Sequence, residues 1–132
     1  MWHPKTIEFD HRLKDLVDEV DAFIEDVYGS RYPLHPERPG RGTTLDPQAD
    51  GLFNIGADFT PGFGSKLGRG YLIDVKMVTL EKVDESVRSE IYHAVVRKIE
   101  ELLPVYFPER ELFIRQEGTH FKIQGDFSLG DI

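Results

Sequence analysis

The chain has 132 residues, of which 39% are hydrophobic and 30% charged, and its formal net charge is −8. These values are typical of a single globular domain, 1–132, and no apolar run approaches the roughly 18 residues that a membrane-spanning helix needs. The negative charge argues against nucleic acid as a partner, the lack of cysteine excludes disulfides and thiolate chemistry, and the lack of a signal sequence favours a cytoplasmic protein.

The first predicted element is an amphipathic helix that follows Asp10, a suitable N-cap residue. For residues 1–9 two alternatives stay open: a strand through the alternation at 6–9, or a helix opened by Pro4. The apolar stripe consists of Leu13, Leu16, Val17, Val20, Ile24 and Val27. The opposite face is acidic, and we interpret it as solvated rather than as a metal or basic-partner surface. It carries Asp15, Asp18, Glu19, Asp21, Glu25 and Asp26.

Residues 30–51 form an irregular segment rich in proline, glycine and arginine. Loops of this length are usually functional or disordered. Arg31, Arg38 and Arg41 either pair with the acidic first helix or bind an anionic ligand, because guanidinium groups suit carboxylates and phosphates. The residues from 46 to 51 resemble a calcium loop only in part, because Ala57 stands where the bidentate glutamate belongs. We therefore predict a turn at Asp50 and Gly51 that leads into a strand.

Two alternating segments, 53–59 and 71–77, predict a β-hairpin. If Phe59 lies opposite Tyr71, the apolar residues of both strands share one face. The connecting loop 60–70 contains four glycines but matches neither the Walker nor the dinucleotide-binding spacing. It is either a plain hairpin loop or an anion-binding nest to which Ser65, Lys66 and Arg69 add donors.

A second helix is predicted after Asp84, and Pro104 ends or kinks it. Its stripe consists of Val87, Ile91, Ala94, Val95, Ile99 and Leu102. Glu90 and His93 have the spacing of two metal ligands, but no third ligand is nearby in the sequence, so we expect an exposed His93 and no metal. Nor does any motif indicate a cofactor.

The last pattern is a short hairpin, with strands at 112–116 and 119–125 around a turn at Glu117 and Gly118. In this register Ile114 lies opposite Phe121.

The order α-β-β-α-β-β predicts an α+β fold, a four-stranded, mostly antiparallel sheet with two helices packed on one face. The other face is mixed, since it carries apolar side chains among polar ones, and we expect a homodimer interface or a ligand platform there. It comprises Asn54, Asp58, Leu72, Asp74, Lys76, Val78, Phe113, Arg115, His120 and Lys122.

Two classes of function remain. The first is a binding or assembly module that recognises an anionic ligand through Arg38, Arg41, Ser65, Lys66 and Arg69. The second is a small enzyme acting on a carboxylate or phosphate substrate. There His120 would be the acid or base, because imidazole titrates near neutral pH, and Asp74 or Asp58 would orient it. The sequence favours the module, because no nucleophile with a flanking base is recognisable.

Overall fold

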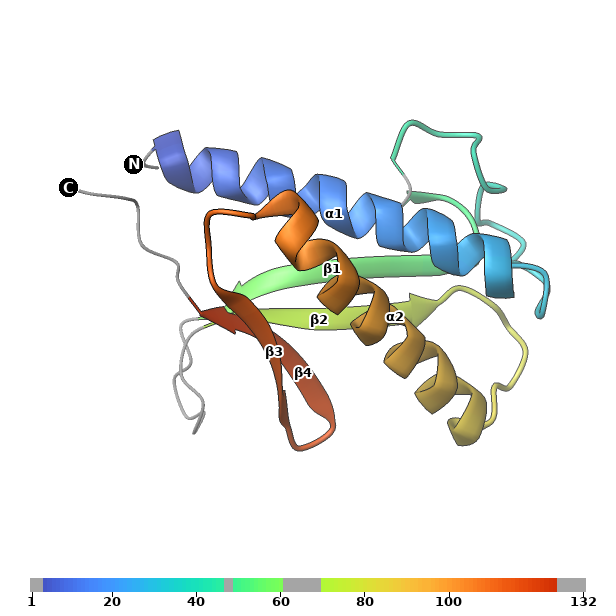
Figure 1. Cartoon of the computed structure of the whole chain (residues 1–132). Helices are drawn as coiled ribbons and strands as arrows, with labels where there is room; N and C mark the ends of the chain where they lie inside the picture. Colours follow the sequence, from blue (N-terminus) through green and yellow to red (C-terminus); the bar gives the residue numbers. More distant parts are fainter. Residues whose placement is uncertain (1–3, 47–48, 61–69, 126–132) are drawn as a thin grey trace.

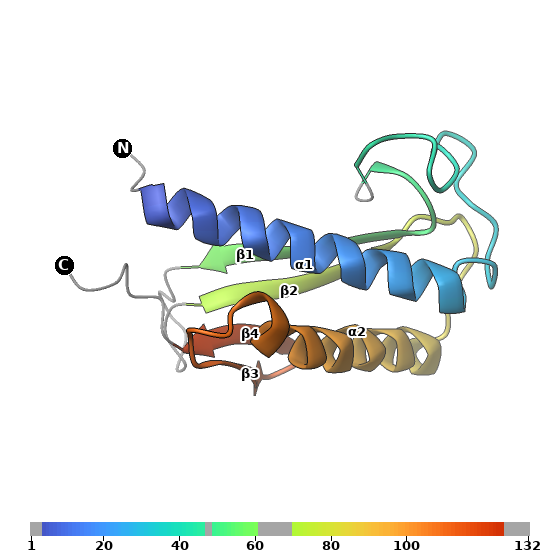
Figure 2. The same ribbon diagram turned by 45° about the horizontal axis from the view of Figure 1, so that its top comes forward.

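The structure, a computed structural model, describes residues 4–46, 49–60 and 70–125. Its elements are α1 (Pro4–Tyr28), β1 (Phe53–Thr60), β2 (Gly70–Met77), α2 (Glu85–Tyr106), β3 (Leu112–Glu117) and β4 (His120–Gly125). The strands form one sheet in the order β1-β2-β4-β3, and all neighbours are antiparallel. Both helices cover the same face of this sheet (Figures 1 and 2). The predicted α+β fold is confirmed.

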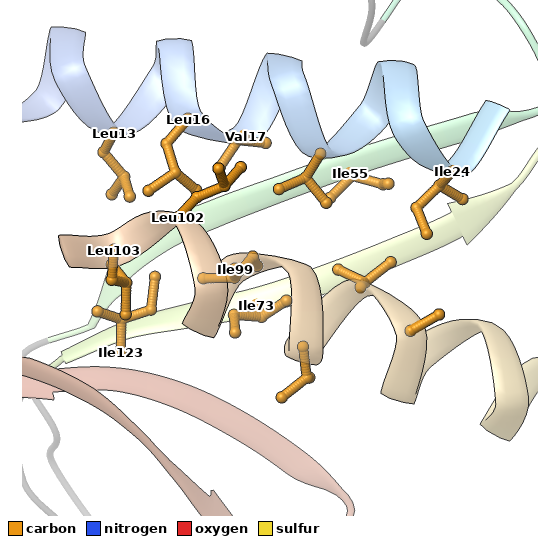
Figure 3. Close-up of a cluster of buried hydrophobic side chains, with 14 of the residues drawn as sticks. Leu13, Leu16, Val17, Ile24, Ile55, Ile73, Ile99, Leu102, Leu103 and Ile123 are labelled. Carbon is orange, nitrogen blue, oxygen red and sulfur yellow. The ribbon is translucent and has the colours of Figure 1, made fainter. Parts of the chain in front are cut away.

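The core lies between the helices and the sheet (Figure 3). Leu16 and Ile24 of α1, Ile99 of α2, and Ile55 and Ile123 of the sheet are all fully buried. They come from the predicted stripes and from alternate strand positions, so helical and strand periodicity point to the same interior. The stripe was wrong at Val27, which is half exposed, while Phe9 and Tyr28 extend it at the two ends of α1.

The helix starts differ from expectation. α1 begins at Pro4, whose missing N–H and fixed φ suit a first helical turn. Asp10 is therefore inside the helix and not its cap, and its carboxylate accepts a 2.8 Å hydrogen bond from the Tyr71 hydroxyl. In α2, Asp84 is the N-cap residue, although its side chain makes no capping hydrogen bond. Pro104 lies in the last turn, and the helix ends two residues later at Tyr106.

The two hairpins test the predicted registers. β1 and β2 pair as predicted, with Phe59 opposite Tyr71. The second hairpin is shifted by two residues, so Gln116 rather than Ile114 lies opposite Phe121, and the turn residues are Gly118 and Thr119. Gly118 has φ of 61°, which glycine adopts without steric cost. A two-residue shift keeps every side chain on its predicted face, which is why the pattern alone does not exclude it.

The two hairpins meet along a short seam. Among the described residues, β2 pairs with β4 only at Tyr71, opposite Ile123, and at Leu72, opposite Lys122. Beyond this seam β4 diverges from β2, and α2 passes over the opening (Figure 1). The sheet is therefore two hairpins joined at one end and open at the other.

Within the described part of the chain, no helix combines the length and the apolar character needed to cross a membrane.

Candidate functional site

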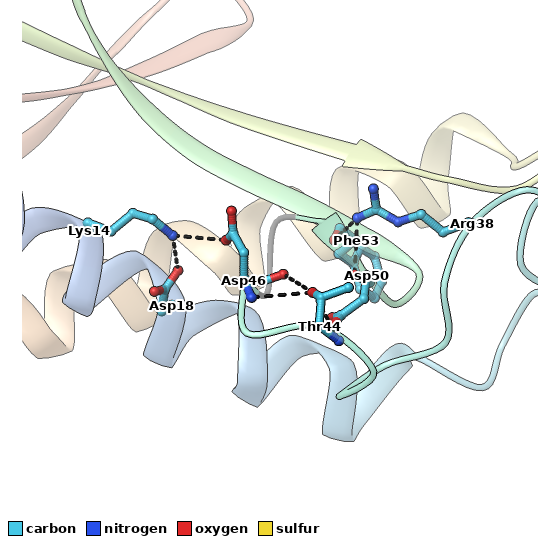
Figure 4. A network of polar contacts seen from close by, with 7 residues as sticks. All are labelled: Lys14, Asp18, Arg38, Thr44, Asp46, Asp50 and Phe53. Carbon is cyan, nitrogen blue, oxygen red and sulfur yellow. Dashed lines mark hydrogen bonds and ion pairs between the residues drawn. The ribbon is translucent and has the colours of Figure 1, made fainter.

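Two of the arginines predicted to bind an anion make contacts within the chain. Arg38 donates to the backbone carbonyl of Asp50 at 3.0 Å (Figure 4). It also donates to the backbone carbonyl of Gly51 at 3.1 Å. Arg41 forms an ion pair with Asp26 of α1 and donates to the Ala22 carbonyl. The pairing alternative therefore describes Arg41 correctly, and Arg38 fastens the loop to the start of β1.

The third arginine of this segment also contacts a helix. Arg31 forms a 3.4 Å ion pair with Glu90 of α2, and its guanidinium lies over the Tyr28 ring. Glu90 is thus engaged by an arginine, and His93, the other half of the weighed metal pair, is exposed as predicted.

The acidic face of α1 is not uniformly solvated. Asp21 and Glu25 are 2% and 7% exposed, so the prediction of a solvated face is wrong at these two positions. The reason is that the segment after α1 folds back and places Asp50, itself buried, close to them. A Glu25 oxygen accepts the Phe53 N–H at 2.8 Å, which satisfies a backbone donor at the start of β1.

Burial governs the electrostatics of these carboxylates. It raises the pKa of Asp21 to about 7, with Glu25, Asp18 and Asp50 adding repulsion, and the Oδ2 atom of Asp21 is buried without a hydrogen-bond partner. Burial also raises the pKa of Glu25, against the backbone donors of Phe53 and Leu52.

Asp50 differs from its two neighbours. Burial acts to raise its pKa, but hydrogen bonds from Thr44 and Gly42 hold that pKa below its usual value. Figure 4 shows the contact of Thr44 with the Asp50 carboxylate. The ionised form of Asp50 is therefore stabilised by its hydrogen bonds, whereas ionisation of Asp21 costs free energy. Within the described ranges, no three histidine or acidic side chains are arranged to hold a metal ion.

The predicted enzyme residues share the sheet face that the helices leave uncovered. Asp58 and Asp74 lie there by strand alternation, and so does His120 at the start of β4. Extending the β2–β4 register would place His120 opposite Asp74, but the strands have diverged at this point. Among the described residues, the one side-chain hydrogen bond of His120 is with the neighbouring Thr119, and the Asp74 carboxylate lies 3.7 Å from the Lys76 Nζ atom. Ser65, Lys66 and Arg69 lie outside the described residues.

A cleft lies between the two hairpins, where β2 and β4 have diverged. Tyr92 of α2 reaches into the sheet there, and its hydroxyl donates to the Ile73 carbonyl at 2.7 Å and accepts from the Phe121 N–H at 3.3 Å. These two groups would be the next pair of the β2–β4 ladder, so the phenol replaces a direct strand–strand contact. Burial raises the pKa of Tyr92, which keeps the hydroxyl protonated as a donor.

The cleft has a volume of about 410 Å³, within the range of ligand sites. Its apolar lining consists of Val75, Met77, Ile91, Tyr92 and Phe121, and its polar lining consists of Glu85, Arg88, Ser89, His93, Gln116, Thr119 and His120. An apolar floor with a few convergent polar groups is the usual composition of a binding site. Of the residues predicted from the sequence to bind a ligand or to catalyse a reaction, only His120 lines this cleft.

His93 has a defined orientation in this cleft. Its Nδ1 atom lies 2.7 Å from the Ser89 carbonyl oxygen, so Nδ1 carries a hydrogen and donates it. The ring packs edge-on against Phe121, with ring centres 5.6 Å apart. Because Nδ1 serves the helix, Nε2 is the atom available to a ligand. The same bond leaves Nδ1 unable to act as a base for the Ser89 hydroxyl.

Sequence reasoning missed this cleft for a physical reason. Arg88 and His93 look like ordinary exposed residues of an amphipathic helix, and Tyr92 lies beside the buried stripe. The one available signal was the polar Tyr92 hydroxyl next to core positions, because a buried phenol needs a hydrogen-bond partner.

The fold defines a small α+β protein with one candidate cleft between its hairpins. A family model described as "Uncharacterised protein" matches residues 4–125, and the chain belongs to this family. It is similar to an uncharacterised protein of Borreliella burgdorferi, with 38% identity over 120 residues, which cover 91% of this chain and 94% of that relative. No solved structure matches the chain.

Proposed function

We propose that this protein is a small binding module that takes an anionic ligand in the cleft between α2, the end of β2 and the β3–β4 turn. The observation that supports it is that Arg88, His93 and His120 line the same cleft as the apolar residues Val75 and Phe121, where Tyr92 bonds to the backbone of β2 and β4. Guanidinium N–H groups donate to carboxylate or phosphate oxygens, and an imidazole whose Nδ1–H is already used donates from Nε2 when the ring is protonated. The ligand class is the one predicted from the sequence, but the site differs from the arginine and glycine loops.

The cleft also supports a module more directly than an enzyme. His120 and Asp74 make no hydrogen bond with each other in the described part of the chain. The Nδ1 atom of His93, which lies 3.3 Å from the Ser89 hydroxyl, already donates to a carbonyl and cannot take a proton from that hydroxyl. Nucleophilic catalysis needs a base that accepts the proton of the nucleophile, and these two pairs do not provide it.

Thermal-shift and calorimetric titrations with inorganic phosphate, citrate and acetyl-glutamate test the proposal. A ligand present at 100 times its Kd stabilises a protein by about 2.7 kcal/mol, which is a readable shift. We expect stabilisation by at least one of these anions in the wild type. It should be lost in Arg88→Gln and kept in Arg97→Gln, the matched control, since Arg97 is exposed on α2 and does not line the cleft.

Equal stabilisation of both variants would place the anion elsewhere and contradict the proposed site. Absence of any stabilisation by all three anions, together with absence of peptide binding in the experiment described below, would overturn the binding module itself.

A further inference from the structure

The free edge of β2 in the cleft suggests what the ligand is. The Val78 N–H donates to the Leu52 carbonyl at 2.7 Å, so even-numbered residues of β2 direct their backbone groups toward β1. The Ile73 carbonyl instead bonds to Tyr92, on the opposite side. Because backbone direction alternates along a strand, Val75 and Met77 also direct their N–H and C=O groups away from β1.

Those groups face the β4 side of β2, where the cleft lies, and Val75 and Met77 line that cleft. β4 pairs with β2 only as far as Leu72, so in the described ranges no strand lies against this part of the edge. An unpaired strand edge is a template for another extended chain, whose main-chain hydrogen bonds then supply affinity.

The cleft is closed at one end. The Tyr92 hydroxyl occupies the ladder position between Ile73 and Phe121, so an added strand cannot continue toward the seam. It can enter only from the Met77 end of β2. Its last residue would then lie near Tyr92, which favours the end of a chain over an internal segment.

Side chains that can donate to an anion line the cleft together with Tyr92. His93 packs on Phe121, whose backbone N–H is bonded to Tyr92, and His120 directly precedes Phe121. Arg88 lines the same cleft one helical turn before Tyr92. A terminal carboxylate complements these groups, because the Arg88 guanidinium, and imidazole rings in their protonated form, make charge-assisted hydrogen bonds with it.

We propose that the cleft binds the carboxyl-terminal segment of a partner protein, which adds to the Val75–Met77 edge of β2 as a short antiparallel strand and places its terminal carboxylate among His93, His120 and Arg88. The direction follows from the entry end. A chain that enters at Met77 and ends near Ile73 runs opposite to β2. This inference rests on the proposed anion site and assigns its ligand.

A library of synthetic heptapeptides, attached to a surface through their N-termini, tests the inference. One copy carries free carboxyl ends and a second copy carries C-terminal amides. We expect binding to a subset of the free-acid peptides. The same sequences as amides should bind at least about tenfold more weakly, since a hydrogen bond to a charged group is worth roughly a factor of ten in affinity or more. Equal binding to both copies would overturn the terminal carboxylate.

The best free-acid peptide is then titrated into labelled protein while backbone amide exchange is followed. Val75 and Met77 amides should gain protection, whereas the Lys76 amide, which faces β1, should be unchanged. N-methylation of the peptide at alternate residues should abolish binding in one phase of the alternation only. Unchanged exchange at Val75 and Met77, or equal tolerance of both methylation phases, would overturn strand addition.

A histidine variant checks the electrostatic part. His93→Gln should weaken the free-acid peptide about tenfold at pH 6 and leave the amide peptide unaffected. His11→Gln, on the exposed surface of α1, is the matched control and should change neither. If small anions bind the cleft while no library peptide does, the proposed function stands and the peptide inference fails.

Discussion

Asp21→Asn should stabilise the protein above neutral pH. Asp21 is 2% exposed, and its Oδ2 atom has no hydrogen-bond partner, while burial first, and then Glu25, Asp18 and Asp50, raise its pKa from 3.8 to about 7. The folded chain therefore binds a proton at Asp21 more tightly than the unfolded chain does. Protonated Asp21 therefore makes its full contribution to the free energy of unfolding below about pH 4. This contribution is lost as the pH rises through about 7.

The magnitude follows from the two pKa values. A difference between 3.8 and about 7 corresponds to about 4 kcal/mol of stability lost once Asp21 is ionised. Local relaxation and water entry lower such costs, so we expect Asp21→Asn to gain roughly 2 kcal/mol at pH 8. At pH 4.5 the wild-type carboxyl is protonated in the folded state, and the two proteins should differ by only about 1 kcal/mol or less.

Urea unfolding at pH 4.5, 6 and 8 measures this difference. Asp15→Asn is the control, because Asp15 is an exposed acidic residue of the same helix and its variant should follow the wild type at every pH. The reasoning is refuted if the wild type and Asp21→Asn lose stability in parallel between pH 4.5 and 8. The same is true if Asp15→Asn gains as much at pH 8.

Three substitutions test other parts of the structure, and a fourth tests the predicted dimer. Tyr92→Phe leaves two backbone groups without a partner, so the free energy of unfolding in urea should fall by about 1–3 kcal/mol. Gly51→Ala should cost more than about 2 kcal/mol, because φ is 74° and the added methyl group would meet the Glu25 carboxylate; a change below 0.5 kcal/mol would contradict this. Ile99→Ala, at a fully buried position, should cost about 2–5 kcal/mol by the same assay. Phe113→Asp, at a side chain that is 42% exposed, should convert the dimer predicted from the sequence into a monomer in light scattering; a wild-type monomer mass would contradict that dimer.

The sequence predicts the fold well where two patterns must agree. Only one parity of register puts Ile55 and Ile73 on the same face, and the first hairpin pairs as predicted. The second hairpin has two registers of the same parity. Which of the two registers forms depends on the turn residue that adopts a positive φ. Gly118 is that residue, and the pattern of apolar side chains does not specify its position in the turn.

The polar interior is the part that the sequence did not predict. Helical periodicity places Asp21 and Glu25 on the side of α1 away from the apolar stripe, and this is correct for the helix alone. They are buried because the irregular segment after α1 returns across them, with Arg38 bonded to the start of β1. Such a return path has no periodic signal, since proline and glycine set its course locally.

The cleft was missed because it depends on the order and divergence of the strands. Alternation predicts which residues of β2 and β4 point inward, but not how far the two strands pair. Tyr92 decides that length from another element, through bonds to the backbone of both strands. His120 was selected for the chemistry of its side chain, and the fact that it lines the same cleft as His93 and Arg88 follows only from the three-dimensional arrangement.

The short seam between the hairpins has a consequence for the order of folding. Each hairpin joins neighbouring segments, so its contacts close small loops at little entropic cost and form early. The seam at Tyr71 and Leu72 joins strands that are separated by the whole of α2, and the Tyr92 hydroxyl bridges it only after that helix has docked. The topology therefore predicts that the two hairpins join late in folding, when α2 docks and the Tyr92 hydroxyl bonds to the backbone of both.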